Sequence, residues 1–445
     1  MKKILNSFFV LTSIALVISA CLPQNVRVPQ SPLLSTLERK SGLIAYIGAD
    51  GNMYVSNQGG TNLSKLTNDA VGSNSESSEF HIYQLPTWSH DGGQLAFVGT
   101  NGTSSAATST LYVTDVKTSK TNKLYSSATE LPVYLYWSPG DANISFLSTS
   151  VSGQELILQS VPAKGGERTI IDTGSPYYWS WAPNGRTLIS HVGGASSSAV
   201  PDHFAFIQLQ DSGVVEDGLD ATPASFQAPA WSPDGSHILL TRVENGNNEI
   251  ILMDGAGVYQ KTIGDFKLNT ALGWSTDGKQ VAFIDGAQAM NAGTLGTLNV
   301  VSIETNKKVS VGDNVIAFYW SPNSEKLAYF IPLLSSATGN NNSNGSGSTT
   351  TQPQQQLLLQ LNMFDVKTGQ SRKLFTYQPT DQFKNTLPYF DQYQQSNTIW
   401  SPDNNNLVLD FIDQSGKPGI AVVAASGQLE PRIIAEGLLA FWSWK

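Results

Sequence analysis

Residues 231–235 read Trp-Ser-Pro-Asp-Gly, and close variants of this pentapeptide recur along the chain. An apolar run ends at each Trp, and a β-rich run follows the turn, as in His-Ile-Leu-Leu-Thr at 237–241. Pro sets φ and removes a donor, and Asp-Gly supplies the positive φ of a tight hairpin. The Trp ring is large enough to fill the space between neighbouring sheets. The copies begin at Trp88, Trp137, Trp181, Trp231, Trp274, Trp320 and Trp400.

The spacing of these copies defines a repeat. Successive intervals are 49, 44, 50, 43, 46 and 80 residues, and the last contains an insertion, so the period is about 45. That length suits four short strands, the size of one propeller blade. Second strands are predicted at 94–98, 237–241, 280–284 and 326–330. Charged residues are only 14%, and helical periodicity is absent beyond the first twenty residues, so the predicted class is all-β.

The two ends of this region look like parts of one further repeat. Runs at 43–47, 52–56 and 62–66 read as second, third and fourth strands that lack a Trp strand. The chain closes on 438–442, a Trp strand ending at Trp442, which lies 42 residues after Trp400. Pairing the two parts would leave neither with an unfilled edge. The sequence therefore predicts, over 41–445, an eight-bladed β-propeller of four-stranded antiparallel blades, closed by its C-terminal strand.

The repeat resembles that of the TolB-like (WD40-like) propeller family. In that family Trp-Ser-Pro-Asp-Gly precedes an Ile/Leu-Ala-Phe/Tyr strand, here Leu-Ala-Phe at 95–97 and Leu-Ala-Tyr at 327–329. The motif also occurs in propeller domains of prolyl-oligopeptidase-type peptidases. TolB carries an α/β domain before its propeller, whereas here only a tether of about twenty residues is expected before it. The peptidases carry a hydrolase domain with a Gly-x-Ser-x-Gly elbow, which this sequence lacks. The resemblance therefore implies an architecture and no reaction.

The first forty residues read as targeting sequence. Lys2 and Lys3 precede an apolar run at 8–18, which is too short to span a bilayer, and Ile-Ser-Ala-Cys follows at 18–21. This tetrapeptide resembles the lipobox of bacterial lipoproteins, in which the Cys is acylated after cleavage before it. We therefore expect a signal peptide at 1–20, lipidation of Cys21, a flexible tether over 21–40 and an extracytoplasmic, membrane-anchored protein of the bacterial cell envelope. The alternative is an ordinary signal peptide cleaved near Ala20.

The charge balance narrows the class of partner. The formal charge is −9, and removal of Lys2 and Lys3 with the signal peptide would make it −11. An acidic surface without a basic stripe argues against a nucleic-acid partner. No phosphate-binding loop or EF-hand-type loop appears, and no cofactor is predicted. His191 and His203, with Asp202, bracket one loop, but no Cys or cluster of carboxylates supports a metal site there.

Long loops mark the predicted functional surface. In propellers of this kind the Trp turns lie on one face, which we call the Trp-turn face. The opposite face, the long-loop face, would carry the loops at 68–86, 100–109, 192–203, 332–356 and 376–398. The insert at 332–356 is Asn/Ser/Gly-rich, which favours flexible decoration. Aromatic residues in or near these loops pack onto the ring or form a binding face. The candidates for that face are His81, Tyr83, Tyr134, Tyr177, His203, Phe383, Tyr389, Phe390 and Tyr393.

Two function classes follow. The first is a non-enzymatic scaffold that binds an envelope protein or a glycan through the long-loop face, because the repeats form a complete ring without recognisable catalytic residues. The alternative is a propeller hydrolase or lyase with acid and base groups at the channel mouth, for which two converging carboxylates or a perturbed His would be needed. A sensor ectodomain would need a signalling partner.

Overall fold

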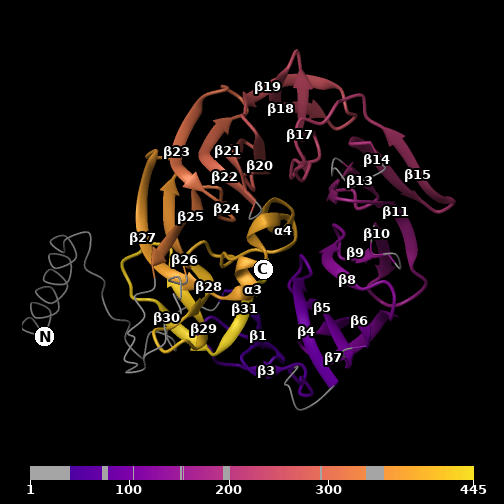
Figure 1. The fold of residues 1–445 in the computed structure, drawn as a ribbon, viewed down its shortest axis with the longest axis vertical. Helices are drawn as coiled ribbons and strands as arrows, with labels where there is room; N and C mark the ends of the chain where they lie inside the picture. The colour runs from indigo at the N-terminus through magenta and orange to yellow at the C-terminus, as the bar shows by residue number, and fades with distance from the viewer. Residues whose placement is uncertain are drawn as a thin grey trace, which may run out of the picture.

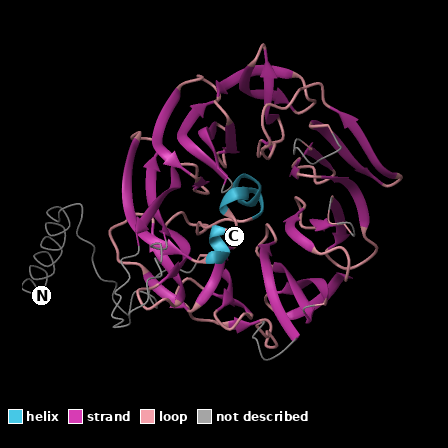
Figure 2. Ribbon diagram, in the orientation of Figure 1, coloured by secondary structure: helices cyan, strands magenta, loops and turns pink. Residues whose placement is uncertain are grey.

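The computed structural model describes residues 41–72, 79–103, 105–150, 153, 155–193, 201–290, 293–336 and 355–445. The predicted signal peptide, Cys21 and the tether lie outside these ranges. The sheets follow one another around a common centre, the arrangement of a β-propeller (Figure 1). Figure 2 shows that strands build the ring and that the helices of the described residues lie at its centre. The predicted all-β class is confirmed. No helix of the described residues is long and apolar enough to span a bilayer.

Five of the sheets are formed by four strands that are consecutive in the chain and antiparallel. In each, the first strand lies nearest the centre and the fourth at the rim (Figure 1). Their strands are β4 (Glu79–Trp88), β5 (Gln94–Thr103), β6 (Ala106–Asp115) and β7 (Lys120–Ser127); β8 (Pro132–Trp137), β9 (Asn143–Thr149), β10 (Leu156–Pro162) and β11 (Thr169–Gly174); β12 (Tyr177–Trp181), β13 (Thr187–Val192), β14 (His203–Gln210) and β15 (Gly213–Gly218); β16 (Ala230–Trp231), β17 (His237–Glu244), β18 (Asn247–Asp254) and β19 (Tyr259–Asp265); and β20 (Asn269–Trp274), β21 (Gln280–Met290), β22 (Gly293–Ser302) and β23 (Lys308–Val315).

A longer sheet follows these five. It has seven strands, in which β27 and β28 pair only through Gln378 with Ile412 and Pro379 with Phe411. The strands are β24 (Ala317–Trp320), β25 (Lys326–Ser336), β26 (Gln355–Asp365), β27 (Gln370–Pro379), β28 (Asn406–Ile412), β29 (Pro418–Ala424) and β30 (Arg432–Ala435).

The last sheet joins the two ends of the described chain. It contains β1 (Ile44–Gly48), β2 (Met53–Ser56), β3 (Ser64–Lys65) and the C-terminal strand β31 (Gly437–Trp442). β31 pairs with β1 in antiparallel register, from Ile44 opposite Trp442 to Gly48 opposite Gly437. The backbone N–H of Trp442 also donates to the carbonyl of Thr398 (2.9 Å), which ties this sheet to the segment before β28.

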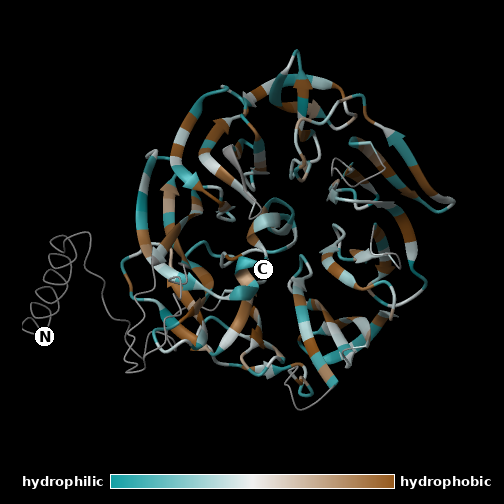
Figure 3. Ribbon diagram, viewed as in Figure 1, coloured by the Kyte–Doolittle hydropathy of each residue, from teal (hydrophilic) through white to brown (hydrophobic). Residues whose placement is uncertain are grey.

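The core lies between the sheets. Trp137 is 1% exposed and packs with Val98 and Leu111 of the preceding sheet. Its Nε1 donates to the carbonyl of Thr87 (3.0 Å), the residue just before Trp88. The same bond, to the residue before the preceding Trp, is made by Trp88, Trp274 and Trp400. These four Trp residues thus fill space between the sheets and also make a hydrogen bond from one sheet to the next. In Figure 3 the outer strands β15, β23 and β27 carry hydrophilic segments, and their side chains are largely exposed.

The Trp turns also touch one another. The fifth motif position has positive φ whether it is Gly235 (73°), Asp141 (59°), Ser324 (61°) or Asn404 (64°). Where it is not Gly, its side chain accepts a hydrogen bond from the backbone N–H at the fourth position of the preceding turn. The donors are Asp91 to Asp141 (3.0 Å), Asp277 to Ser324 (2.9 Å) and Asn323 to Asn404 (2.7 Å). The left-handed conformation costs free energy for a residue with a side chain, and at these three positions a hydrogen bond between sheets offsets that cost.

Two predicted loops differ in the structure. The insert at 332–356 is shorter than expected, because β25 continues to Ser336 and β26 begins at Gln355; residues 337–354 lie outside the described ranges. The segment at 376–398 is not an irregular loop. After β27 it forms α3 (Asp381–Lys384), the 3-10 helix η1 (Leu387–Tyr389) and α4 (Phe390–Ser396).

Candidate functional site

The helical segment α3–η1–α4 occupies the centre of the ring (Figures 1 and 2). α4 contacts the innermost strands β8, β12, β20 and β24, which belong to four different sheets. These inner strands present unpaired backbone groups to the channel, because each is the edge of its sheet. We call residues 381–397 the plug.

Gln392 holds the plug most firmly. Its Oε1 accepts from the backbone N–H of Trp179 (2.9 Å), and its Nε2 donates to the carbonyl of Trp179 (2.9 Å) and to Tyr134 Oη (3.2 Å). Tyr134 Oη in turn donates to the carbonyl of Gln392 (2.9 Å). Gln392 is 2% exposed, so these bonds form away from water.

Three further polar side chains of α4 satisfy the edges of other sheets. Asp391 Oδ2 accepts from the N–H of Ala228 (2.7 Å). Gln394 Nε2 donates to the carbonyl of Leu272 (2.9 Å), and Gln395 Nε2 to that of Pro229 (3.0 Å). The amides thus replace the strand partners that the inner edges lack.

Apolar contacts hold the other end of the plug. Phe390 packs edge-on against Phe318 (5.2 Å between ring centroids), and Phe383 against Phe330 (5.8 Å). Thr380 caps α3 by accepting from the N–H of Phe383, and its hydroxyl donates to the carbonyl of Leu438 in β31 (2.6 Å).

Two carboxyl groups are buried near the centre. Burial raises the pKa of Asp391 to about 6, although backbone N–H groups of Ala228 and Gln392 oppose the shift. Burial raises the pKa of Asp410 to about 8, and its Oδ2 has no hydrogen-bond partner among the described residues. At neutral pH Asp410 is therefore mostly protonated, and Asp391 mostly ionised.

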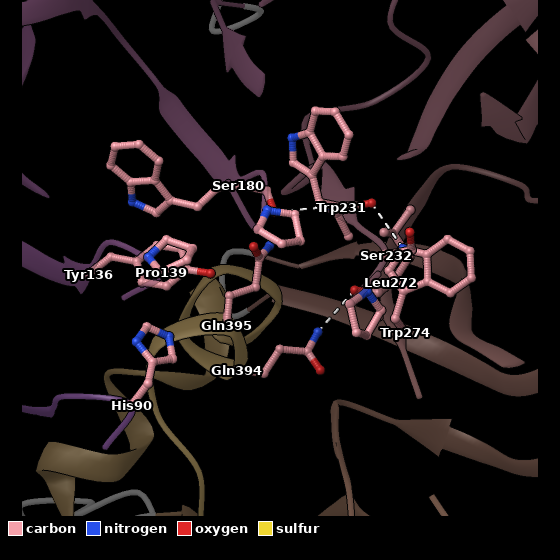
Figure 4. A pocket seen from close by; sticks show the side chains of 15 residues that line it. His90, Tyr136, Pro139, Ser180, Trp231, Ser232, Leu272, Trp274, Gln394 and Gln395 are labelled. Atoms are coloured by element: carbon pink, nitrogen blue, oxygen red, sulfur yellow. Dashed lines mark hydrogen bonds between the residues drawn. The ribbon is translucent and has the colours of Figure 1, made fainter. Parts of the chain in front are cut away.

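A cavity of about 350 Å³ opens beside α4 toward the Trp-turn face (Figure 4). Gln394 and Gln395 of the plug lie between the walls, with Tyr136 on one side and Trp231 and Trp274 on the other. The lining is completed by His90, Pro139, Ser180, Trp181, Pro183, Ala230, Ser232, Pro233, Leu272 and Gly273.

Two more cavities lie toward the long-loop face. One, of about 240 Å³, lies between the plug and the β4 and β8 strands and is lined by Tyr134, Tyr393, Gln382 and Asn385, among others. The other, of about 490 Å³, lies at the β4–β5 end and is lined by Glu79, His81 and Asn101, among others. His81 Nδ1 also lies 3.2 Å from Asp69 Oδ2.

The structure moves much of the predicted binding face into the interior. Tyr83, Tyr134, Tyr177, Phe383 and Phe390 are each at most 6% exposed. Their rings or hydroxyls contact other residues of the protein. For example, Tyr177 Oη donates a hydrogen bond to Asp172 Oδ2 (2.8 Å), and Tyr83 Oη donates one to Asp69 Oδ1 (2.6 Å). For these five the surface interpretation is corrected, because the segments that carry them pack into the ring.

The other four predicted residues remain accessible to different degrees. Tyr389 is 51% exposed at the end of η1, and Tyr393 packs edge-on against Tyr134 (5.0 Å) while lining a cavity. His81 lines the cavity at the β4–β5 end. His203 lies in β14, far from the plug in the sheet order, with its Nε2 3.7 Å from Glu216 Oε1.

His191 does not join His203 in a metal site. Its ring is buried, with Nδ1 against the carbonyl of Gln227 (2.8 Å) and Nε2 against Asp202 Oδ1 (2.8 Å). Among the described residues, no three His, Cys, Asp or Glu side chains converge as metal ligands.

Sequence reasoning missed the residues that hold the plug: Asp391, Gln392, Gln394 and Gln395. The available signal was the run of amides at 392–397 inside the one long interval between Trp residues. Polar side chains at that density need partners when buried, and a channel lined by strand edges provides them.

No protein-family model matches the chain, and no curated protein matches it in sequence. Among solved structures it is similar to a prolyl endopeptidase, at 10% identity and a TM-score of 0.51, over 80% of this chain and 49% of that one. It is also similar to TolB from Acinetobacter baumannii (13% identity, TM-score 0.35, 82% of this chain and 83% of that one). An oligogalacturonate lyase in complex with manganese is similar too (12% identity, TM-score 0.43, 87% and 98%). The chain spans about half the length of the endopeptidase. At these identities the likeness concerns the propeller fold and not the activity.

Proposed function

We propose that this chain is a TolB-like lipoprotein of the bacterial cell envelope, a closed eight-bladed propeller that binds an envelope protein or glycan through its long-loop face. The observation that carries the proposal is the plug. The inner edges of the ring are bound by side chains of the plug: Gln392, Asp391, Gln394 and Gln395. Because the plug occupies the channel, the two faces of the ring are the surfaces that can bind a partner.

The blade count rests on the seven-stranded sheet, which we interpret as two blades. β27 and β28 share only two pairs of residues, whereas every other pair of neighbouring strands in that sheet shares at least three. The backbone carbonyl of Ile399 accepts from Val408 (2.8 Å), so residues 399–400 act as the innermost strand beside β28. With the β1–β31 pairing, this interpretation gives eight blades and a closed ring.

Exposed apolar side chains support the long-loop face. Val133 (41% exposed), Leu268 (57%), Leu334 (69%) and Tyr389 (51%) all lie where inner strands begin, where second strands end or on the plug. Because neighbouring strands run antiparallel, the start of an inner strand and the end of the second strand lie on the same face of the ring. Single exposed apolar residues are common, but their presence on the same face as the long loops suits a contact surface.

The proposed anchor lies near the closing sheet. Residue 41 lies three positions before the start of β1 at Ile44, so a tether from acylated Cys21 would emerge beside the pairing of β1 with β31. Replacement of Cys21 by Ser is expected to release the protein from the membrane fraction and to abolish incorporation of an alkyne-palmitate label. Unchanged labelling would contradict lipidation at this residue.

Chemical crosslinking in native membranes tests the binding proposal. A photo-reactive residue at Tyr389 or Leu334 is expected to give one dominant adduct, identified by mass spectrometry. The same residue at Val258, which is 58% exposed in the turn between β18 and β19 on the opposite face, serves as the control. Equal adducts from all three positions, or none from Tyr389 and Leu334, would argue against the long-loop face.

One observation keeps the enzyme alternative as a second candidate. Glu79 and His81 line the same cavity at the β4–β5 end, where a carboxyl and an imidazole could act as acid and base. A hydrolase or lyase working there would lose its turnover of glycan or peptide substrates on Glu79→Gln. Unchanged crosslinking with lost turnover would favour the enzyme over the scaffold.

A further inference from the structure

The cavity on the Trp-turn face contains polar groups that the fold leaves unused. Tyr136 is 8% exposed and lines the cavity, yet its Oη makes no hydrogen bond to any described residue. Its backbone carbonyl, by contrast, accepts from Ser145 Oγ (2.8 Å). Its hydroxyl is therefore available to bond a molecule that enters the cavity.

The plug supplies acceptors opposite Tyr136. Gln394 and Gln395 use their Nε2 groups to bind the carbonyls of Leu272 and Pro229, and their Oε1 atoms accept no hydrogen bond from the described residues. Gly273 allows this position, because a Cβ there would lie 2.9 Å from both Nε2 and Oε1 of Gln394. The cavity therefore offers a ligand one hydroxyl that can donate or accept, Tyr136 Oη, and two amide oxygens that can accept, the Oε1 atoms of Gln394 and Gln395.

Apart from His90, whose ring Nδ1 lies 2.7 Å from Asp141 Oδ1, the walls carry no ionisable acid or base other than Tyr136 and are partly apolar. Prolines from three successive Trp turns, Pro139, Pro183 and Pro233, stand beside the indoles of Trp231 and Trp274, both half-buried. None of the lining residues is Asp, Glu, Lys or Arg, so a charged ligand would lack a counter-charge. A wholly apolar ligand would leave Tyr136 and the two amide oxygens unpaired.

A peptide strand is also disfavoured. Peptides that add to a sheet edge need free backbone groups, and here the edge carbonyls of Leu272 and Pro229 are bound by the plug. What fits is a small, neutral molecule with an apolar C–H face and a rim of hydroxyls. A volume of about 350 Å³ is at the small end of ligand pockets.

We propose that this cavity binds a short neutral saccharide. The ring faces pack on Trp274 and the prolines, hydroxyls donate to Oε1 of Gln394 and Gln395, and another hydroxyl accepts from Tyr136 Oη. The site lies on the face opposite the proposed partner surface, so the two proposals stand or fall separately.

Titration calorimetry on the detergent-solubilised full chain tests the site, with maltotriose, cellotriose, mannotriose and chitotriose as neutral probes. Tri-galacturonic acid and deca-proline are the charged and peptide comparisons. At least one neutral trisaccharide is expected to bind, and Tyr136→Phe to weaken it roughly 2- to 10-fold, the value of one neutral hydrogen bond. Because Tyr136 Oη makes no hydrogen bond to the part of the chain that the structure describes, the Phe variant is expected to melt at the wild-type temperature.

Tyr319→Phe is the matched control. Tyr319 stands just before Trp320, as Tyr136 stands before Trp137, and is equally buried, but it does not line this cavity. Its replacement is expected to leave saccharide affinity unchanged. The proposal is overturned if none of the four neutral trisaccharides binds at millimolar concentration, if Tyr136→Phe and Tyr319→Phe bind equally, or if only the charged or the peptide probe binds.

Discussion

The Trp turns and the plug both join one sheet to the next, but they do so through different kinds of contact. The turns use a repeated pattern, in which Trp Nε1 and the fifth motif position bind the preceding repeat. The plug occurs once and reaches four sheets with amides and a carboxylate. The contacts at the fifth motif position are exposed or half-buried and join neighbouring repeats, whereas those of Gln392 and Asp391 in the plug are buried and join residues far apart in the chain. Loss of one plug contact is therefore expected to cost more than loss of one turn contact.

Gln392→Ala is expected to have the largest effect. It would leave the N–H and carbonyl of Trp179 unpaired in the interior, at about 1–3 kcal/mol each. We expect the free energy of unfolding, measured in urea, to fall by about 2–6 kcal/mol. Gln394→Ala, which removes one bond from a half-buried side chain, is the control and is expected to cost about 1 kcal/mol. Equal losses of unfolding free energy for the two variants would mean that the deeper burial of Gln392 does not raise the cost of losing its contacts.

A buried carboxyl group in β28, Asp410, and a hydrogen-bonded one in a Trp turn, Asp234, are expected to respond oppositely to pH. The raised pKa of Asp410 means that its contribution is complete below about pH 4 and is lost as the pH rises through about 8. Unfolding curves from pH 4 to 8 should therefore show Asp410→Asn gaining on the wild type by up to about 1.4 kcal/mol per pH unit.

Asp234 in a Trp turn provides the contrast. Hydrogen bonds from Ser232 and Ser236 lower its pKa to about 2, so its contribution is present above the unfolded value and is lost as the pH falls below about 4. Asp234→Asn is expected to lose stability relative to the wild type near neutral pH and to approach it in acid. If Asp234→Asn showed the same pH trend as Asp410→Asn, the two carboxyl groups would not have pKa values shifted in opposite directions.

Within the turns, hydrogen bonding and burial can be separated. Trp137 Nε1 donates to Thr87, whereas Trp320 Nε1 is buried without a partner among the described residues. Trp137→Phe is expected to cost about 1 kcal/mol more than Trp320→Phe in chemical denaturation, since only the first leaves a carbonyl unpaired. A larger loss for Trp320→Phe would mean that packing outweighs the hydrogen bond.

The smallest effect is expected for one of the substitutions at the fifth motif position. Asn404→Gly loses one bond but relieves a positive φ, so the change should stay within about 0.5 kcal/mol. Asp141→Gly also loses bonds from the backbone of His90 and Asp91 and from the His90 ring, and should cost about 1–2 kcal/mol. Thermal melts of the two variants compare them directly.

The same contrast explains what the sequence could predict. The strand at 94–98 lies within β5 and the final run within β31, because alternating apolar residues and Trp turns specify them locally. The plug could not be predicted this way. α4 has only seven residues, and its partners are remote, since Gln392 and Trp179 are 213 residues apart. For the same reason Tyr134 and Phe390 read as surface aromatics although the plug buries them.

Hydrogen exchange at two backbone amides tests most directly whether the plug is a permanent part of the ring. The N–H groups of Trp179 and Ala228 are bound only by side chains of the plug, Gln392 and Asp391. We predict that peptides containing them exchange as slowly as β9, whose five central residues are buried, and that Gln392→Ala speeds exchange at Trp179 selectively. Exchange of both amides within seconds in the wild type would show an open channel and contradict the account.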